Sequence, residues 1–183
     1  TADAVKVAVT ADLNNVDLAS SVITWKGTKP TGAHDGTIML QEGSLNLEAG
    51  KLTGGTFVIE MSSIKNLDLD AEGAAKIVGH LSSPDFFDVA TYATSKFVIT
   101  SVVEAEGKLA VTGNLTVKDI TKSITIPATL LSVGNVTTFK SDKFNIDRAE
   151  FNIKYASKTF FDNLKDKFID DAIELSFTVN TKA

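Results

Sequence analysis

The stretch that decides the fold is HLSSPDFFDVATYATSKFVI, residues 80–99, in which a helical pattern passes through a turn into a strand. Pro84 and Asp85 mark the turn, because proline cannot continue a helix and aspartate favours turns. Phe86 and Phe87 follow directly. Two adjacent phenylalanines in a turn gain little unless that turn covers an apolar interior. We therefore expect this corner to close one end of a barrel.

On both sides of the corner, apolar and polar residues alternate with a period of two, which sends successive side chains to opposite faces of a sheet. Phe97 and Ile99 face inward in this pattern, whereas Lys96 and Thr100 face outward. The same alternation recurs along most of the chain and predicts this inward-facing set: Ile23, Trp25, Ile38, Leu40, Leu45, Leu47, Phe57, Ile59, Met61, Leu109, Val111, Leu115, Val117, Ile124, Ile126, Phe144, Ile146, Phe151, Ile153, Tyr155, Ile173, Leu175, Phe177 and Val179.

The connections between these strands are short and contain glycine, which tolerates the positive φ that tight hairpins need. They are predicted at Gly43, Gly54-Gly55, Glu106-Gly107 and Gly134-Asn135. Two segments instead show helical spacing of apolar residues, residues 71–81 and residues 157–168. We expect each to form a short amphipathic helix, and the second to cover a barrel end.

About eight antiparallel strands with one apolar face can stack as a sandwich or close on themselves, and closure removes the exposed edges. We predict an all-β fold with two short helices, in which a closed antiparallel barrel of about eight strands forms a single domain over residues 15–183. Residues 1–14 are expected to be a tail or a loosely attached strand. A barrel of this size is either packed solid or holds one small ligand.

Composition excludes several classes of function. The chain has no cysteine, so disulfides, thiol catalysis and cysteine-based zinc sites are ruled out. A net charge of -5 with a single arginine argues against nucleic acid as a partner. The longest apolar runs fall far short of the roughly 20 residues of a membrane-spanning helix. We predict no metal, no cofactor and no catalytic residue.

Several motifs, taken in order and spacing, resemble the YceI-like family of lipocalin-like β-barrel proteins. The matching pieces are Gly79-His80-Leu81, Asp85-Phe86-Phe87-Asp88, Tyr92, Phe97, Gly113-Asn114-Leu115-Thr116-Val117, Thr121-Lys122 and Arg148-Ala149-Glu150-Phe151. Asp119 and Asn152 stand where the family usually has glycine. Both residue types tolerate a left-handed backbone, so the turn geometry is expected to persist.

The resemblance implies a lipocalin-like barrel that binds or carries a polyisoprenoid, or another long apolar lipid such as a quinone with a prenyl tail. The predicted tunnel lining is Phe57, Ile59, Phe97, Ile99, Val111, Leu115, Phe151, Phe160 and Phe177. Arg148 is predicted either to contact the lipid head group at the mouth or to form a salt bridge with a neighbouring carboxylate. The resemblance also implies export to the periplasm or the cell exterior. A lipid anchor lost from the N-terminus and a homodimer stay open.

Two other functions compete with lipid binding. An enzyme acting on a small amphiphile would use His34, His80 and Arg148 around a polar pocket, although neither histidine has a recognised ligand spacing. A filled barrel that serves as an interaction module would show a contiguous apolar surface patch instead of an internal cavity. An internal cavity would favour lipid binding.

Overall fold

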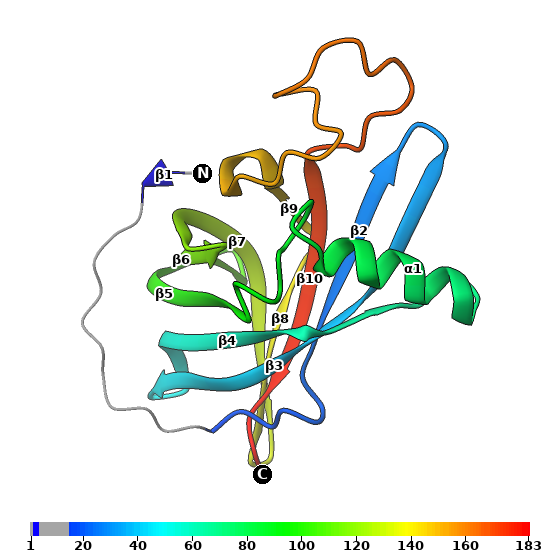
Figure 1. Ribbon diagram of the computed structural model, residues 1–183. Helices are drawn as coiled ribbons and strands as arrows, with labels where there is room; N and C mark the ends of the chain where they lie inside the picture. Colours follow the sequence, from blue (N-terminus) through cyan, green and yellow to red (C-terminus); the bar gives the residue numbers. More distant parts are fainter. Residues whose placement is uncertain (1, 4–14) are drawn as a thin grey trace.

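The computed structural model describes residues 2–3 and 15–183, and it is mostly strand (Figure 1). Its elements in chain order are β1 (Ala2–Asp3), β2 (Val22–Lys29), β3 (Gly32–Glu48), β4 (Lys51–Asn66), α1 (Ala71–Ser82), β5 (Thr94–Ala105), β6 (Lys108–Val117), β7 (Ile120–Val133), β8 (Val136–Ser141), β9 (Phe144–Asp147), the 3-10 turn η1 (Arg148–Phe151) and β10 (Ala172–Asn180). No helix in these described residues is long and apolar enough to cross a bilayer.

The predicted closed barrel is confirmed. Consecutive strands from β2 to β8 pair antiparallel, and β10 pairs with both β2 and β8, which closes a ring of eight strands. β9 continues beside β10 where β8 ends. At the predicted tail, β1 pairs with Ser123 and Lys122 of β7, and the other predicted tail residues up to 14 lie outside the described part.

Two of the four predicted hairpin turns are confirmed, with Gly107 and Gly134 at φ of 78° and 60°. The turns predicted at Gly43 and Gly54-Gly55 are wrong, because β3 and β4 are long strands that meet at residues 49–50. Gly43 and Gly55 make room for an interior ring instead. A Cβ added at Gly43 would lie 3.3 Å from the Phe57 ring, and one added at Gly55 would lie 3.2 Å from it.

The first predicted helix is confirmed as α1, which begins where the Asp70 carboxylate accepts a hydrogen bond of 2.7 Å from the Gly73 amide. The second predicted helix, over residues 157–168, is wrong. Asn163 and Lys165 adopt φ of 63° and 54°, and a left-handed residue cannot continue a right-handed helix. Apolar spacing suited a helix there, but residues 152–171 form a projecting loop that we call the 152–171 loop.

The strand predicted through Phe151, Ile153 and Tyr155 is also wrong, because Asn152 turns the backbone at φ 61° directly after η1. Phe151 and Ile153 are nevertheless buried, whereas Tyr155 is exposed. Asp119 adopts φ 62° as well, so the two residues that replace glycine keep the expected left-handed turns.

One part of the barrel interior is packed solid. The Phe139 ring is fully buried, with centroids 6.2 Å from Phe57 and 4.9 Å from Phe177. A Cβ added at Gly113 would lie 2.4 Å from the ring of Phe97, so glycine is required for that ring to lie against the wall. Phenylalanine rings that pack on one another and over wall glycines therefore fill this region.

Candidate functional site

The remaining part of the interior is a cavity of about 470 Å³ between the barrel wall and α1. This volume lies within the range of roughly 300–1,000 Å³ that small-ligand pockets occupy. Apolar side chains from β2, β3, β4, β6 and β10 form most of its wall, among them Trp25, Ile38, Met61, Val117, Ile173 and Leu175. The site is therefore shaped for an apolar molecule.

Helix α1 covers the cavity. Ile77 and Leu81 line it from this helix, and Ile77, Val78 and Leu81 pack against the cluster around Trp25 and Met61. No residue of α1 is fully buried, which is typical of a helix that lies over an opening instead of inside a core. The helix is held mainly by one apolar face, so it serves as a cover for the pocket.

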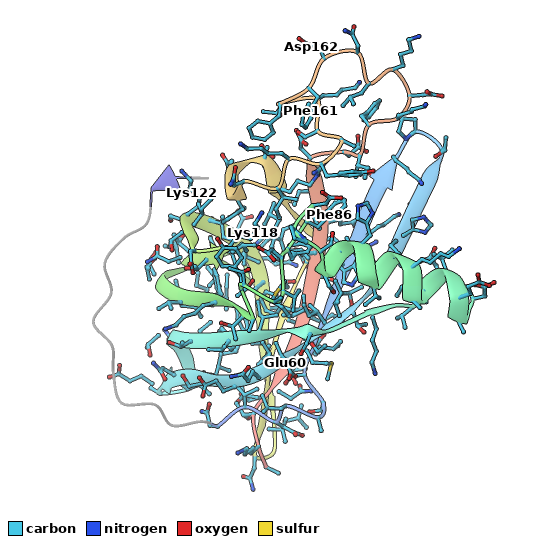
Figure 2. All side chains as sticks on the ribbon, viewed as in Figure 1. Glu60, Phe86, Lys118, Lys122, Phe161 and Asp162 are labelled. Atoms are coloured by element: carbon cyan, nitrogen blue, oxygen red, sulfur yellow. The ribbon has the colours of Figure 1, made fainter. Side chains whose placement is uncertain are left out.

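The corner at residues 80–99 closes the same pocket, as the paired phenylalanines after Pro84 predict. Phe86 is buried, and Phe86 and Phe87 both line the cavity. The ring of His80, in the last turn of α1, meets Phe86 edge-on at 4.9 Å. Phe86 lies near the end of this helix (Figure 2). The paired phenylalanines thus form part of the ligand site as well as a structural plug.

Trp25, the only tryptophan of the chain, lies in the pocket wall opposite a strand glycine. A Cβ added at Gly36 would lie 1.8 Å from the Lys65 carbonyl oxygen and 2.7 Å from the indole ring. Glycine at this position therefore allows β4 and the indole to approach β3 closely. Any ligand in the pocket would change the surroundings of this single fluorophore.

Arg148 lies in the pocket wall with its side chain only 1% exposed. Its Nε donates to the Asp170 carbonyl at 3.1 Å, its Nη1 to Ile153 at 3.0 Å and its Nη2 to Ile169 at 2.9 Å. Asp171 Oδ1 lies 3.6 Å from Nη2 and accepts no hydrogen bond. The guanidinium therefore clamps the two ends of the 152–171 loop together.

The electrostatics of Arg148 follow from this position. Burial lowers the pKa of the guanidinium, and the nearby carboxylates, Asp171 first, oppose that change. Arginine stays protonated in proteins, so a charge is held in the wall. Arg148 forms an ion pair with Asp171, which lies 23 residues further along the chain and not in the strand turn where the salt bridge is predicted. The predicted head-group contact stays a prediction.

Each histidine is paired with an aspartate. His34 Nδ1 lies 2.8 Å from Asp68 Oδ2, and His80 Nε2 lies 3.0 Å from Asp85 Oδ2. The hydrogen bond from His34 is the main cause that lowers the pKa of Asp68 to about 2. His34, His80 and Arg148 all line the pocket, as the enzyme hypothesis requires, but each is already bound to its own partner. Within the described residues, no three His, Cys, Asp or Glu side chains form a metal site.

The structure brings together only part of the predicted tunnel lining. Ile59 and Leu115 line the cavity, whereas Phe57, Phe97, Ile99, Val111 and Phe151 belong to the buried core and Phe177 packs beside Phe139. Phe160 is 41% exposed on the 152–171 loop. The wall residues missing from that prediction all belong to the inward-facing set of the strands: Trp25, Ile38, Met61, Val117, Ile173 and Leu175. Alternation does not indicate which inward-facing residues border empty space.

Comparisons with known proteins agree with this architecture. The family model of the YceI-like domain matches residues 6–181. A UPF0312 protein of Pseudomonas savastanoi pv. phaseolicola is 35% identical over 118 residues, which is 64% of this chain and 56% of that protein. A UPF0312 protein of Pseudomonas fluorescens is 42% identical over 76 residues, 41% of this chain and 36% of that protein. These matches thus span about a third to just over half of the relatives' length.

Solved structures share the fold. Burkholderia cenocepacia BcnA superposes with a TM-score of 0.75 at 23% identity, covering 92% of this chain and 100% of that one. A polyisoprenoid binding domain from Saccharophagus degradans gives 0.66 at 15% identity, covering 92% and 97%. The YCEI protein of Campylobacter jejuni gives 0.60 at 16% identity, covering 100% and 93%. At these identities the likeness concerns the fold.

Proposed function

The chain belongs to the YceI-like domain family, and we propose that it binds one long apolar lipid, a polyisoprenoid or a prenyl-tailed quinone, in the barrel cavity. The observation that carries the proposal is the cavity of about 470 Å³ with its apolar wall. The Saccharophagus degradans neighbour is described as a polyisoprenoid binding domain, which adds support from a protein of the same fold.

Burial of the isoprenoid chain supplies the affinity. At about 0.8 kcal/mol for each buried methylene-sized group, a five-carbon isoprene unit contributes roughly 4 kcal/mol before the cost of ordering the chain. Two or three units therefore give useful binding without a polar contact. The proposed role is carriage of the lipid and not catalysis, because the wall is mostly apolar and His34, His80 and Arg148 each already bind a protein partner.

The fluorescence of Trp25 tests this proposal without any variant, since it is the sole tryptophan and lies in the pocket wall. Titration with geranylgeraniol is expected to give a saturable change in intensity, and native mass spectrometry is expected to find one lipid per chain. No fluorescence change with prenyl alcohols of several lengths, together with no lipid in the native spectrum, would refute lipid binding.

A further inference from the structure

The exposed aromatic side chains of the described residues all lie on one loop. Tyr155, Phe160 and Phe161 are 42%, 41% and 49% exposed, and all three belong to the 152–171 loop. The loop projects from the barrel end at which the β2–β3 hairpin also turns (Figure 1), and Phe161 lies on its outer part (Figure 2). Exposed phenylalanines gathered on one projection mark an interaction surface.

The same loop carries an excess of positive charge. That excess is confined to its outer part, because the whole loop is neutral, with four lysines and four aspartates. Asp170 and Asp171 lie at its base, where their carboxylates accept hydrogen bonds from Thr28 and Thr159. Residues 154–167 sum to +2 in a chain whose net charge is -5: Lys154, Lys158, Lys165, Lys167, Asp162 and Asp166. Lys154 Nζ lies 5.0 Å from the ring centroid of Phe160, so the ammonium and the exposed ring share one surface. Lysine beside an aromatic ring suits the boundary between lipid head groups and acyl chains, where apolar stems and charged ends are both satisfied.

The base of the loop is fixed beside the pocket. Arg148 binds the carbonyls of Ile153 and Ile169, and the ring of Tyr155 packs on His80 at 4.7 Å. Ile169 and Asp170 themselves line the cavity. A surface that captures the tip of the loop would therefore lie next to the pocket.

We propose that the 152–171 loop docks the protein onto an anionic lipid bilayer, with Phe160 and Phe161 entering the head-group boundary and the lysines contacting lipid phosphates. Two rings and a few lysines give reversible binding, because each lysine near an anionic surface adds only a modest attraction. A second copy of this chain fits the loop less well, because a two-fold contact would set two positive outer segments, residues 154–167 of each copy, against each other. Docking needs no ligand in the pocket, so it stands apart from the proposed function.

Vesicle flotation tests the docking, using vesicles of phosphatidylcholine alone and vesicles in which a third of the lipid is phosphatidylglycerol. The wild-type chain is expected to float with the anionic vesicles and to be released by salt. Phe160→Ser with Phe161→Ser is expected to reduce the bound fraction at least about tenfold, because both rings lose their burial in lipid. The matched control, Leu131→Ser with Val133→Ser, changes side chains that are 64% and 70% exposed on the β7–β8 hairpin at the other barrel end, and it is expected to bind like wild type.

Unchanged Trp25 fluorescence and circular dichroism establish that each variant is folded. Flotation that is absent in the wild type, or equal in the wild type and the phenylalanine variant, overturns the docking. A wild-type dimer in sedimentation that the phenylalanine variant loses, without flotation, assigns the loop to a second copy and also overturns it. Titration with geranylgeraniol in solution separates the two proposals, because a chain that floats but binds no prenyl alcohol keeps the docking and loses the proposed function.

Discussion

Replacing Arg148 by methionine tests whether this residue clamps the 152–171 loop or serves the ligand. The substitution removes three hydrogen bonds, of 2.9 to 3.1 Å, to the carbonyls of Ile153, Ile169 and Asp170. Loss of one partner from a buried charged network costs about 3–5 kcal/mol, a large part of the roughly 5–15 kcal/mol that stabilises a typical domain. We expect the free energy of unfolding to fall by about 3–5 kcal/mol.

Urea unfolding followed by Trp25 fluorescence measures this loss, and limited proteolysis measures release of the loop. Arg148→Lys is expected to lose nearly as much stability, because a single ammonium cannot reach three carbonyls as the planar guanidinium does. Asp171→Asn is the comparison, since it removes the charge 3.6 Å from Nη2 and alters the acceptor of the Thr159 hydroxyl, while the three carbonyl hydrogen bonds of Arg148 remain. It is therefore expected to cost less stability than Arg148→Met and to leave the loop protected from proteolysis. An Arg148→Met chain as stable and as protease-resistant as wild type would refute the clamp.

Three further changes test the packing, the Asp68 network and the cavity. Gly36→Ala is expected to lower the free energy of unfolding in urea by more than about 3 kcal/mol, because its Cβ would lie 1.8 Å from the Lys65 carbonyl oxygen. The control Gly79→Ala has nothing within 4 Å of its Cβ and should stabilise α1 by up to about 1 kcal/mol. Similar values for both variants would contradict the close approach of β3 and β4 at Gly36. The folded-state pKa of Asp68, about 2, lies below its ordinary value of 3.8, so its stabilisation is present above that value and is lost as pH falls towards 2. The stability difference between wild type and Asp68→Asn should therefore shrink from pH 5 to pH 2, and a constant difference would contradict the His34–Asp68 bond. Val117→Phe fills part of the cavity and should weaken geranylgeraniol binding about tenfold or more. The control Val103→Phe changes an exposed side chain and should bind like wild type. Equal binding by both variants would place the ligand outside the cavity.

The barrel could be predicted from the sequence because alternation needs only local information. Each strand shows its inward face through residues such as Phe97 and Ile99, and the corner at Pro84 fixes where α1 ends. The helix predicted over residues 157–168 failed for a local reason as well. Left-handed residues at Asn163 and Lys165 override the apolar spacing, and neither residue type requires that conformation.

The position of the cavity could not be predicted, because a period of two gives the face of a side chain and not the distance to the opposite wall. Phe57 and Trp25 both face inward, yet only Trp25 lines the pocket. The difference depends on which strand glycines lie opposite each ring. Gly43 and Gly55 admit the ring of Phe57 into the solid part of the core, and this pairing joins residues that become neighbours only after β3 and β4 align.

The cavity argues against a barrel that serves only as a scaffold. Its volume of about 470 Å³ is bounded mostly by apolar side chains, which forgo the contacts that close packing of a filled core would give them. The chain has the means to fill such space, since the rings of Phe57 and Phe177 pack on the fully buried Phe139 in another part of the same barrel. Instead, α1 and the corner at Phe86 and Phe87 cover the space without entering it. A filled interaction module would have no physical reason to keep this volume, whereas a lipid that occupies it would restore the lost packing each time it binds.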